Sequence, residues 1–169
     1  EQDAQHIQIL VARRLVQRRG STAVLALELG AAPGSWTQVL VEKGMRVVAC
    51  DLLPMDPVEG ASFLRADFTD AVAQEELLAA LGGQADVVLT DLSPNRSGNK
   101  SLDQARLVGL TEQALLLARQ CLRPGGDFLC KLLQGADQQA LLKGCKFFFD
   151  NGAILKPPAS RNDSSEVYF

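Results

Sequence analysis

Apolar and polar residues alternate in blocks along the chain, and the blocks predict two kinds of element. Short, continuous apolar runs are typical of buried strands, and the longer segments between them repeat apolar residues at helical spacing. We predict strands over Val24 to Gly30, Met45 to Asp51, Ser62 to Asp67, Ala85 to Asp91 and Asp127 to Leu133. We predict helices over Ser35 to Lys43, Thr69 to Leu81, about Leu102 to Leu122 and about Asp137 to Asp150, with a turn over Arg123 to Gly126.

Strands separated by helices of this length predict right-handed βαβ crossovers and a parallel sheet covered on both faces. Two further apolar runs, AILKP and SEVYF, are joined only by PASRNDSS, which is too short for a crossover helix. We therefore expect these two runs to pair antiparallel at one edge. The predicted fold is α/β and Rossmann-like: a doubly wound, mostly parallel seven-stranded sheet with an antiparallel C-terminal edge hairpin.

The composition is that of one globular domain. The chain has 169 residues, of which 47% are hydrophobic and 22% charged, and no run is long and apolar enough to cross a bilayer. The first residues lead into no secretory signal peptide. We expect residues 1–169 to form a single domain without membrane contact. The cysteines show no zinc-ligand spacing, so we expect reduced, mostly buried thiols and no metal site.

The net charge is −3 and the pI is near 5.2, which argues against an extended surface for nucleic acid. Arg13, Arg14, Arg18 and Arg19 nevertheless form a local basic patch. They can contact phosphate or form an ordinary solvated helix face, and the sequence does not decide between the two.

Polar residues stand where the predicted strands end. The set consists of Gly30, Asp51, Asp67, Asp91 and, within the fifth strand, Lys131. In open sheets of this kind ligands bind beyond the carboxyl ends of the strands, so we expect the functional site at this edge.

The first strand runs into a glycine-rich loop, LELGAAPGSWTQ, which lacks the spacing of a dinucleotide-binding loop. Asp51, 21 positions after Gly30, is placed to accept hydrogen bonds from the two ribose hydroxyls of an adenosine. Pro33 removes a backbone N–H, and Trp36 would crowd a pyrophosphate. Asp67 is placed for the adenine amino group. These features favour S-adenosylmethionine over NAD, although each acid could also be a turn cap.

Lys131, Asp91 and Glu166 can converge beside the cofactor's methyl group. A lysine inside an apolar strand is costly to bury unless it is paired or functional. For methyl transfer to a ribose 2′-hydroxyl, Lys131 could accept the proton. Burial disfavours a charged ammonium and neighbouring carboxylates favour it, and the sequence does not rank these effects. The structural alternatives are a turn cap, a snorkelling lysine and an exposed edge charge.

From Ala23 to Phe169 the chain resembles the RrmJ/FtsJ family of ribosomal RNA 2′-O-ribose methyltransferases. The similar blocks are LGAAPGSWTQ, ACDLLPMDPVEGASFLRADFTD, ADVVLTDLSPNRSG, LRPGGDFLCKLLQG and KPPASRNDSSEVYF. The resemblance implies a catalytic set of Lys131, Asp91 and Glu166. It implies S-adenosylmethionine binding by Gly30, Pro33, Gly34, Ser35, Trp36, Asp51, Asp67 and Asp91.

The same resemblance implies a partner in ribosomal RNA or the large ribosomal subunit, and a monomer. LLPMDP is similar to the bacterial members and KPPASRNDSSEVYF also to the mitochondrial ones. The expected location is therefore cytoplasmic for a bacterial protein, with the mitochondrial matrix as the alternative.

The chain departs from the family in its N-terminal region. The family's Lys-Asp-Lys-Glu tetrad takes its first lysine from an N-terminal helix, whereas AQHIQILVARRLVQRR has no lysine. Gln5, His6 or Gln8 falls near that position. Either the helix has diverged or a basic segment precedes the chain. We also expect Arg96 and Lys100, after Asp91, to help seat the RNA backbone.

Alternative functions are therefore a catalytically weakened homologue that binds cofactor or ribosome and a small-molecule methyltransferase. An NAD-dependent oxidoreductase is disfavoured by the loop spacing.

Overall fold

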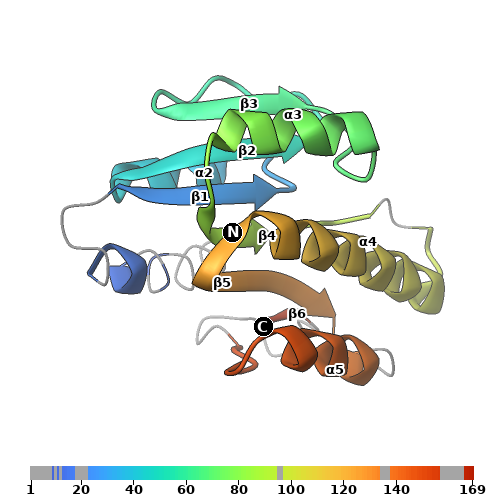
Figure 1. Ribbon diagram of the computed structural model, residues 1–169. Coiled ribbons are helices and arrows are strands. Elements are labelled where there is room, and N and C mark those ends of the chain that lie inside the picture. The colour runs from blue at the N-terminus through green and yellow to red at the C-terminus, as the bar shows by residue number, and fades with distance from the viewer. Residues whose placement is uncertain are drawn as a thin grey trace.

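The computed structural model describes residues 9, 11, 13–17, 23–94, 97–133, 138–156 and 166–169 (Figure 1). The strands are β1 (Val24–Leu29), β2 (Met45–Asp51), β3 (Ala61–Arg65), β4 (Ala85–Thr90), β5 (Leu122–Leu133) and β6 (Glu166–Tyr168). The helices are α2 (Ser35–Glu42), α3 (Ala71–Leu81), α4 (Lys100–Cys121) and α5 (Gln138–Phe148). Residues 13–17 are also helical. Within these described ranges, no helix has the length and apolar character needed to span a membrane.

The six strands form one sheet in the order β3-β2-β1-β4-β5-β6. The first five run parallel and β6 pairs antiparallel with β5, which confirms the predicted fold class. The chain order reverses between β1 and β4, because β2 and β3 extend to one side and β5 and β6 to the other. This reversal is the switch point at which open α/β sheets bind ligands.

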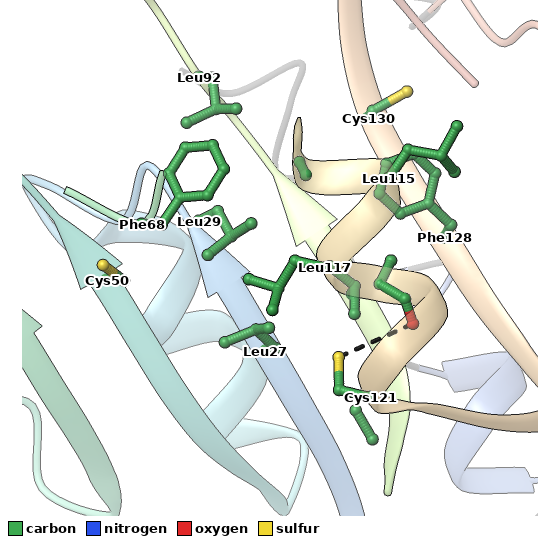
Figure 2. Packing of buried hydrophobic residues seen from close by; sticks show 14 of the residues in the cluster. Leu27, Leu29, Cys50, Phe68, Leu92, Leu115, Leu117, Cys121, Phe128 and Cys130 are labelled. Carbon is green, nitrogen blue, oxygen red and sulfur yellow. Dashed lines mark hydrogen bonds between the residues drawn. The ribbon is translucent and has the colours of Figure 1, made fainter. Parts of the chain in front are cut away.

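Each face of the sheet carries its own hydrophobic core. One core packs β-strand side chains such as Leu27 and Leu29 against α3, α4 and α5, and Figure 2 shows Leu117 of α4 beside them. The other core packs the opposite face against α2, through Trp36 and Leu40. The buried Leu15, from the helical residues 13–17, belongs to this second core. The four cysteines are free and buried, as expected.

The edge hairpin is shorter than predicted, and the sheet has six described strands instead of seven. Leu155, from the AILKP run, forms a single antiparallel bridge with Tyr168, with N–O distances of 2.7 and 2.8 Å. Lys156 comes next in the sequence and is followed by two prolines, Pro157 and Pro158, which have no N–H to donate to a ladder. The antiparallel pairing is therefore confirmed, but the seventh strand is reduced to one bridge.

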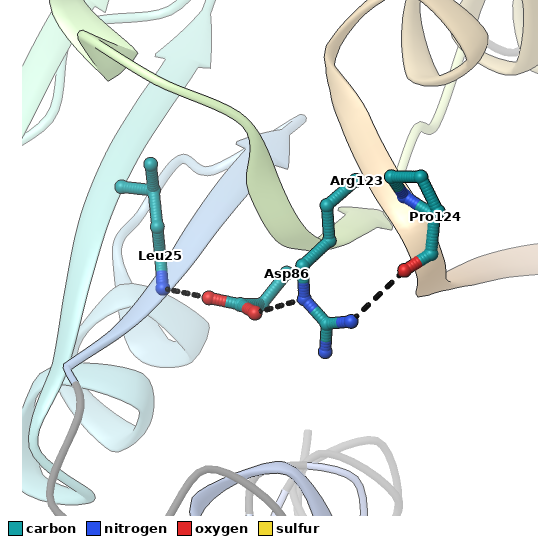
Figure 3. A network of polar contacts seen from close by, with 4 residues as sticks. All are labelled: Leu25, Asp86, Arg123 and Pro124. Carbon is teal, nitrogen blue, oxygen red and sulfur yellow. Dashed lines mark hydrogen bonds and ion pairs between the residues drawn. The ribbon is translucent and has the colours of Figure 1, made fainter.

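The predicted turn at Arg123 to Gly126 is instead an irregularity inside β5. Ala85 pairs with Leu122 and Val87 with Asp127, so the segment between them bulges opposite Asp86. The carboxylate of Asp86 is only 1% exposed and accepts hydrogen bonds from Leu25 N–H and Arg123 Nε (Figure 3). A turn-forming sequence is thus held in the sheet by a buried carboxylate that ties β1, β4 and β5 together.

Helix α4 begins at a well-formed cap. The side chain of Asn99 accepts hydrogen bonds from the N–H groups of Ser101 and Leu102, and Asp103 lies in the first turn. The cap fixes where the chain leaves the loop after β4. Lys100 is the first residue of α4 and is exposed, whereas Arg96, Arg18, Arg19, Gln5, His6 and Gln8 lie outside the described residues.

Candidate active site at the carboxyl ends of the strands

The glycine-rich loop between β1 and α2 lies directly against the end of β4. Gly30 has φ +81°, and a Cβ at this position would come within 3.1 Å of the backbone of Asp91 and Leu92. Gly34 has φ +103°, and a Cβ there would meet Met55 Sδ at 2.9 Å. Glycine is therefore needed at both positions, for conformation and for space. The loop and the end of β4 form one continuous surface.

The ring of Trp36 is not part of this surface. The side chain is 5% exposed and lies in the core beside Tyr168 of β6, with ring centroids 6.0 Å apart. The predicted cofactor contact of Trp36 would have to come from its main chain, in the first turn of α2. Pro33 and Ser35 lie on either side of Gly34, where the loop enters the helix.

The carboxylate of Asp51 organises the loop from the neighbouring strand. Its Oδ2 accepts a hydrogen bond from Ala32 N–H at 2.9 Å and its Oδ1 accepts one from Leu53 N–H at 2.8 Å. Each carboxylate oxygen has a further lone pair, so these bonds leave room for a ligand hydroxyl on both. Asp51 thus caps the turn, and its contact with the ribose hydroxyls of a cofactor stays a prediction.

Asp67 follows β3 and shapes its own turn. Its Oδ1 accepts hydrogen bonds from the N–H and the hydroxyl of Thr69, at 2.9 and 2.7 Å. Its Oδ2 carries no hydrogen bond within the described part of the chain, so it can accept one from a ligand amino group. The prediction for Asp67 therefore stands as a prediction.

Glu28 is the residue that the sequence reasoning missed. It lies in β1, two positions before Gly30, and its side chain is fully buried. Thr37 of α2 donates a hydroxyl hydrogen bond to Oε2 at 2.7 Å, whereas Oε1 has no hydrogen-bond partner among the described residues. The visible signal was a single acid inside the apolar run VLALEL.

The environment of Glu28 favours its neutral form. Burial raises the pKa of the carboxyl to about 8, with smaller contributions from the negative charges of Asp91 and Asp51. The hydrogen bond from Thr37 acts in the opposite direction. The buried Oε1 can still accept a hydrogen bond from a bound ligand.

Lys131 and Asp91 form the ion pair that the sequence predicts. Lys131 Nζ lies 2.8 Å from Asp91 Oδ1, and Lys131 is 9% exposed. The contact follows from strand pairing, since Thr90 of β4 is opposite Cys130 of β5 and the two charged residues come next in each strand. The structure thus brings together the ammonium, the carboxylate and the glycine-rich loop.

Glu166 enters the same region through its backbone. It is the first residue of β6 and pairs with Leu133, while Tyr168 pairs with Lys131. The side chain of Glu166 lies outside the described atoms, so its role as a companion of Lys131 stays a prediction. The arrangement as a whole offers carboxylates for a cationic, hydroxyl-bearing ligand and one buried amine for proton transfer.

A model of the family described as FtsJ-like methyltransferase matches residues 7–169. The Ribosomal RNA large subunit methyltransferase E of Gluconobacter oxydans is 47% identical over 143 residues, which cover 84% of this chain and 53% of that protein. Its counterpart in Xanthobacter autotrophicus is 46% identical over 148 residues, covering 84% and 58%. That of Azoarcus sp. is 47% identical over 148 residues, covering 85% and 72%. The chain thus spans about half the length of the first of these relatives.

Solved structures share the fold at low sequence identity. A crystal structure from Plasmodium falciparum, provisionally named a ribosomal RNA methyltransferase, superposes with a TM-score of 0.77 at 22% identity, over 93% of this chain and 92% of that one. Human Methyltransferase-like protein 13, solved in complex with SAH, gives a TM-score of 0.71 at 17% identity, over 99% and 80%. These similarities show the fold.

Proposed function

The chain belongs to the FtsJ-like methyltransferase family, and from this premise we propose that it methylates a ribose 2′-hydroxyl of RNA, using S-adenosylmethionine. The proposal rests on one observation above all: the buried Lys131 Nζ lies 2.8 Å from Asp91 Oδ1, next to the glycine-rich loop. The names of the bacterial relatives support large-subunit ribosomal RNA as the substrate.

The residues present fit the proposed cofactor. When bound, S-adenosylmethionine supplies an electrophilic methyl group on a sulfonium. Glu28 Oε1 is buried, has no partner among the described residues and can accept from the cofactor's α-ammonium, and Gly30 leaves the loop free of a side chain. Asp51 would hold the ribose hydroxyls and Asp67 the adenine amino group. The glycine loop, with Pro33, Gly34, Ser35 and the main chain of Trp36, would line the methionine portion together with Asp91.

Lys131 would act on the RNA hydroxyl. To act as the base, Nζ would have to be the neutral amine; it would then take the hydroxyl proton as the 2′-oxygen bonds to the methyl group and the methyl–sulfur bond breaks, releasing S-adenosylhomocysteine, and Asp91 Oδ1 would hold the resulting ammonium in place. Because Lys131 is 9% exposed, little water reaches Nζ to compete for the proton. Glu166, two residues before Tyr168 in β6, would be the companion of the lysine.

One sequence feature favours a second candidate function, a weakened homologue that binds cofactor or ribosome without efficient transfer. Residues 1–22 contain no lysine, whereas the family's tetrad takes its first lysine from this region. If that lysine contributes to RNA or transition-state binding, its absence lowers the transfer rate and leaves cofactor binding unaffected.

Transfer assays separate these functions. We would incubate the protein with tritiated S-adenosylmethionine and large ribosomal subunits, ribosomal RNA or free nucleosides, alongside Lys131→Ala. Lys143→Ala, which removes an exposed lysine of α5, is the matched control. We expect label on RNA that falls by 10²-fold or more only in Lys131→Ala. If calorimetry shows cofactor binding but no RNA is methylated, the result would support the weakened homologue. If only free nucleosides are methylated, the result would support a small-molecule methyltransferase.

We also propose that the chain acts as a single domain and a monomer, without membrane contact. The relatives named above are bacterial, which favours the cytoplasmic over the mitochondrial alternative. Size-exclusion chromatography with light scattering tests the monomer directly.

A further inference from the structure

A pocket lies near the start of β5, whereas Lys131 lies near the end of this strand. It has a volume of about 610 Å³, and its lining residues come mainly from the ends of α4 and α5, the start of β5 and the segment after α5. Asp127, which lines the pocket, precedes Lys131 by four positions in β5, or roughly 13 Å at 3.3 Å per residue, whereas Phe169, which also lines it, pairs with Cys130. Lys131, Asp91 and Gly30 are not among the residues that line the pocket, and its size suits a ligand as large as a nucleotide.

Three arginines from three segments line this pocket, and no lysine does. Arg14 comes from the helical residues 13–17, Arg119 from the last turn of α4 and Arg123 from β5. Arg123 is held in place by Asp86 and by the carbonyl of Pro124, which accepts from Nη1 at 3.0 Å (Figure 3). In a chain of net charge −3, this is a local concentration of guanidinium groups suited to phosphate.

Aromatic rings accompany the arginines. The guanidinium of Arg119 lies 4.0 Å from the ring centroid of Phe148, and Phe149 stacks on Phe128 with an interplanar angle of 6°. All of these rings line the pocket. Aromatic faces and stacked guanidinium planes are the groups on which proteins hold unpaired RNA bases. The acids of the lining include the exposed Asp150, which can accept from an exocyclic amino group of a base.

We propose that this arginine–phenylalanine pocket, lined by Arg14, Arg119, Arg123, Phe148 and Phe149, binds an unpaired nucleotide of the RNA substrate outside the active site. The inference rests on the proposed RNA methyltransferase function and extends it. A nucleotide held here fixes how the RNA lies along β5 and so helps to select which ribose reaches Lys131. Because uracil lacks an exocyclic amino group, the pocket prefers cytosine or adenine to uracil.

The test measures RNA binding by the double variant Arg14→Ala/Arg119→Ala. The probes are fluorescein-labelled ribosomal RNA fragments and single-stranded hexamers of cytidine or uridine. We expect affinity to fall five- to twenty-fold, and the slope of log K against log salt to decrease in magnitude by about 1.4, since two phosphate contacts are lost at about 0.7 each for a single strand. Arg65→Ala, an exposed arginine on β3, is the control and should change neither quantity.

Two further variants separate binding from folding. Arg119→Lys keeps the charge but loses the planar stack on Phe148, and we expect it to lose part of the affinity and little of the salt slope. Phe149→Leu keeps an apolar side chain. It should weaken binding of the cytidine hexamer while the melting temperature stays near that of the parent. Calorimetric binding of S-adenosylmethionine should be unchanged in all variants.

Each contrary result would contradict the pocket proposal for a different reason. If the parent methylates RNA but the double variant binds it with the parental affinity and salt slope, the pocket proposal is wrong and the proposed function stands. If the variant loses binding of a ribosomal protein and keeps RNA affinity, the pocket belongs to a protein partner. If free cytidine monophosphate binds more tightly than the hexamer, it is a mononucleotide site. A parent that neither binds nor methylates RNA overturns both proposals.

Discussion

Glu28 is a buried ionisable residue of β1, and its protonation should make the stability of the folded protein depend on pH. Its pKa is about 8 in the folded protein against an ordinary value of 4.5. Between these two values the folded state retains a proton that the unfolded chain releases, so the parent loses stability as pH rises through this window. Glu28→Gln keeps the hydrogen bond from Thr37 and has no such titration. We expect its melting temperature, relative to the parent, to rise steadily from pH 5 to pH 8.

Thermal unfolding of the cofactor-free proteins at intervals between pH 5 and pH 9 provides the measurement. Near pH 5 the two proteins should have similar melting temperatures, because Glu28 is then protonated in the folded parent. The same substitution should weaken S-adenosylmethionine binding, because the neutral amide is a poorer partner for an ammonium. A pH-independent difference in melting temperature would contradict the buried, proton-binding carboxyl.

A second prediction for a single residue concerns Gly30. Gly30→Ala places a Cβ 3.1 Å from the backbone of Asp91 and Leu92, at φ +81°. We expect a loss of about 1–3 kcal/mol in the free energy of unfolding, since both conformation and space are unfavourable. Cofactor affinity should also fall, because the loop must move away from β4. Gly83→Ala is the control, as a Cβ there meets nothing within 4 Å. Equal urea midpoints for the two variants would contradict the close approach.

Individual site residues were predictable to different degrees. Asp91 and Lys131 were found because strand ends meet at one edge of a parallel sheet, and their 2.8 Å contact follows from strand pairing. Glu28 was missed because an acid inside an apolar strand gives no sign of which elements cover it. The ring of Trp36 was assigned to a ligand surface, but it is 5% exposed in the core beside Tyr168, a contact between distant residues that local spacing does not encode.

Among the secondary-structure elements, β5 depends on the buried pair of Asp86 and Arg123. Asp86 is 1% exposed and accepts from Leu25 N–H and Arg123 Nε across three neighbouring strands. Removing Arg123 deprives the buried carboxylate of this charged partner. We expect Arg123→Ala to cost about 3–5 kcal/mol in the free energy of unfolding, measured by urea denaturation. Arg65→Ala, whose side chain is exposed, should cost less than 1 kcal/mol.

The contrary result for this pair is an Arg123→Ala protein with an unfolding free energy within 1 kcal/mol of the parent. In that case Asp86 would be satisfied without Arg123, with Leu25 N–H among its remaining partners. The bulge in β5 would then follow from its two glycines and not from the ion pair.

The elements themselves were largely predictable, because apolar runs and helical spacing are local properties. The helices α2 to α5 and the parallel strands lie within a few residues of their expected positions. Two elements differ from the expectation. The segment from Arg123 to Gly126 looks like a turn, but Asp86 holds it in β5. The run around Leu155 looks like a strand, but it meets β6 at one bridge only.

The molecule as a whole places two candidate binding regions at opposite ends of β5. Lys131 and Asp91 lie near its carboxyl end, and the arginine–phenylalanine pocket lies where the strand begins. An RNA that reaches both would be oriented along the strand, despite the net charge of −3. The overall charge thus predicts weak non-specific binding, while local arginines determine where RNA is held.

Nucleoside analysis of the methylated RNA tests the proposed reaction at its chemical step. After incubation with S-adenosylmethionine and large ribosomal subunits, the RNA is digested to nucleosides and measured by mass spectrometry. We predict a 2′-O-methylated nucleoside with the parent and with Lys143→Ala. Lys131→Ala should yield none, while calorimetry should show that it binds the cofactor as the parent does. A methyl group on a base instead of the ribose, or undiminished ribose methylation by Lys131→Ala, would contradict the role given to Lys131.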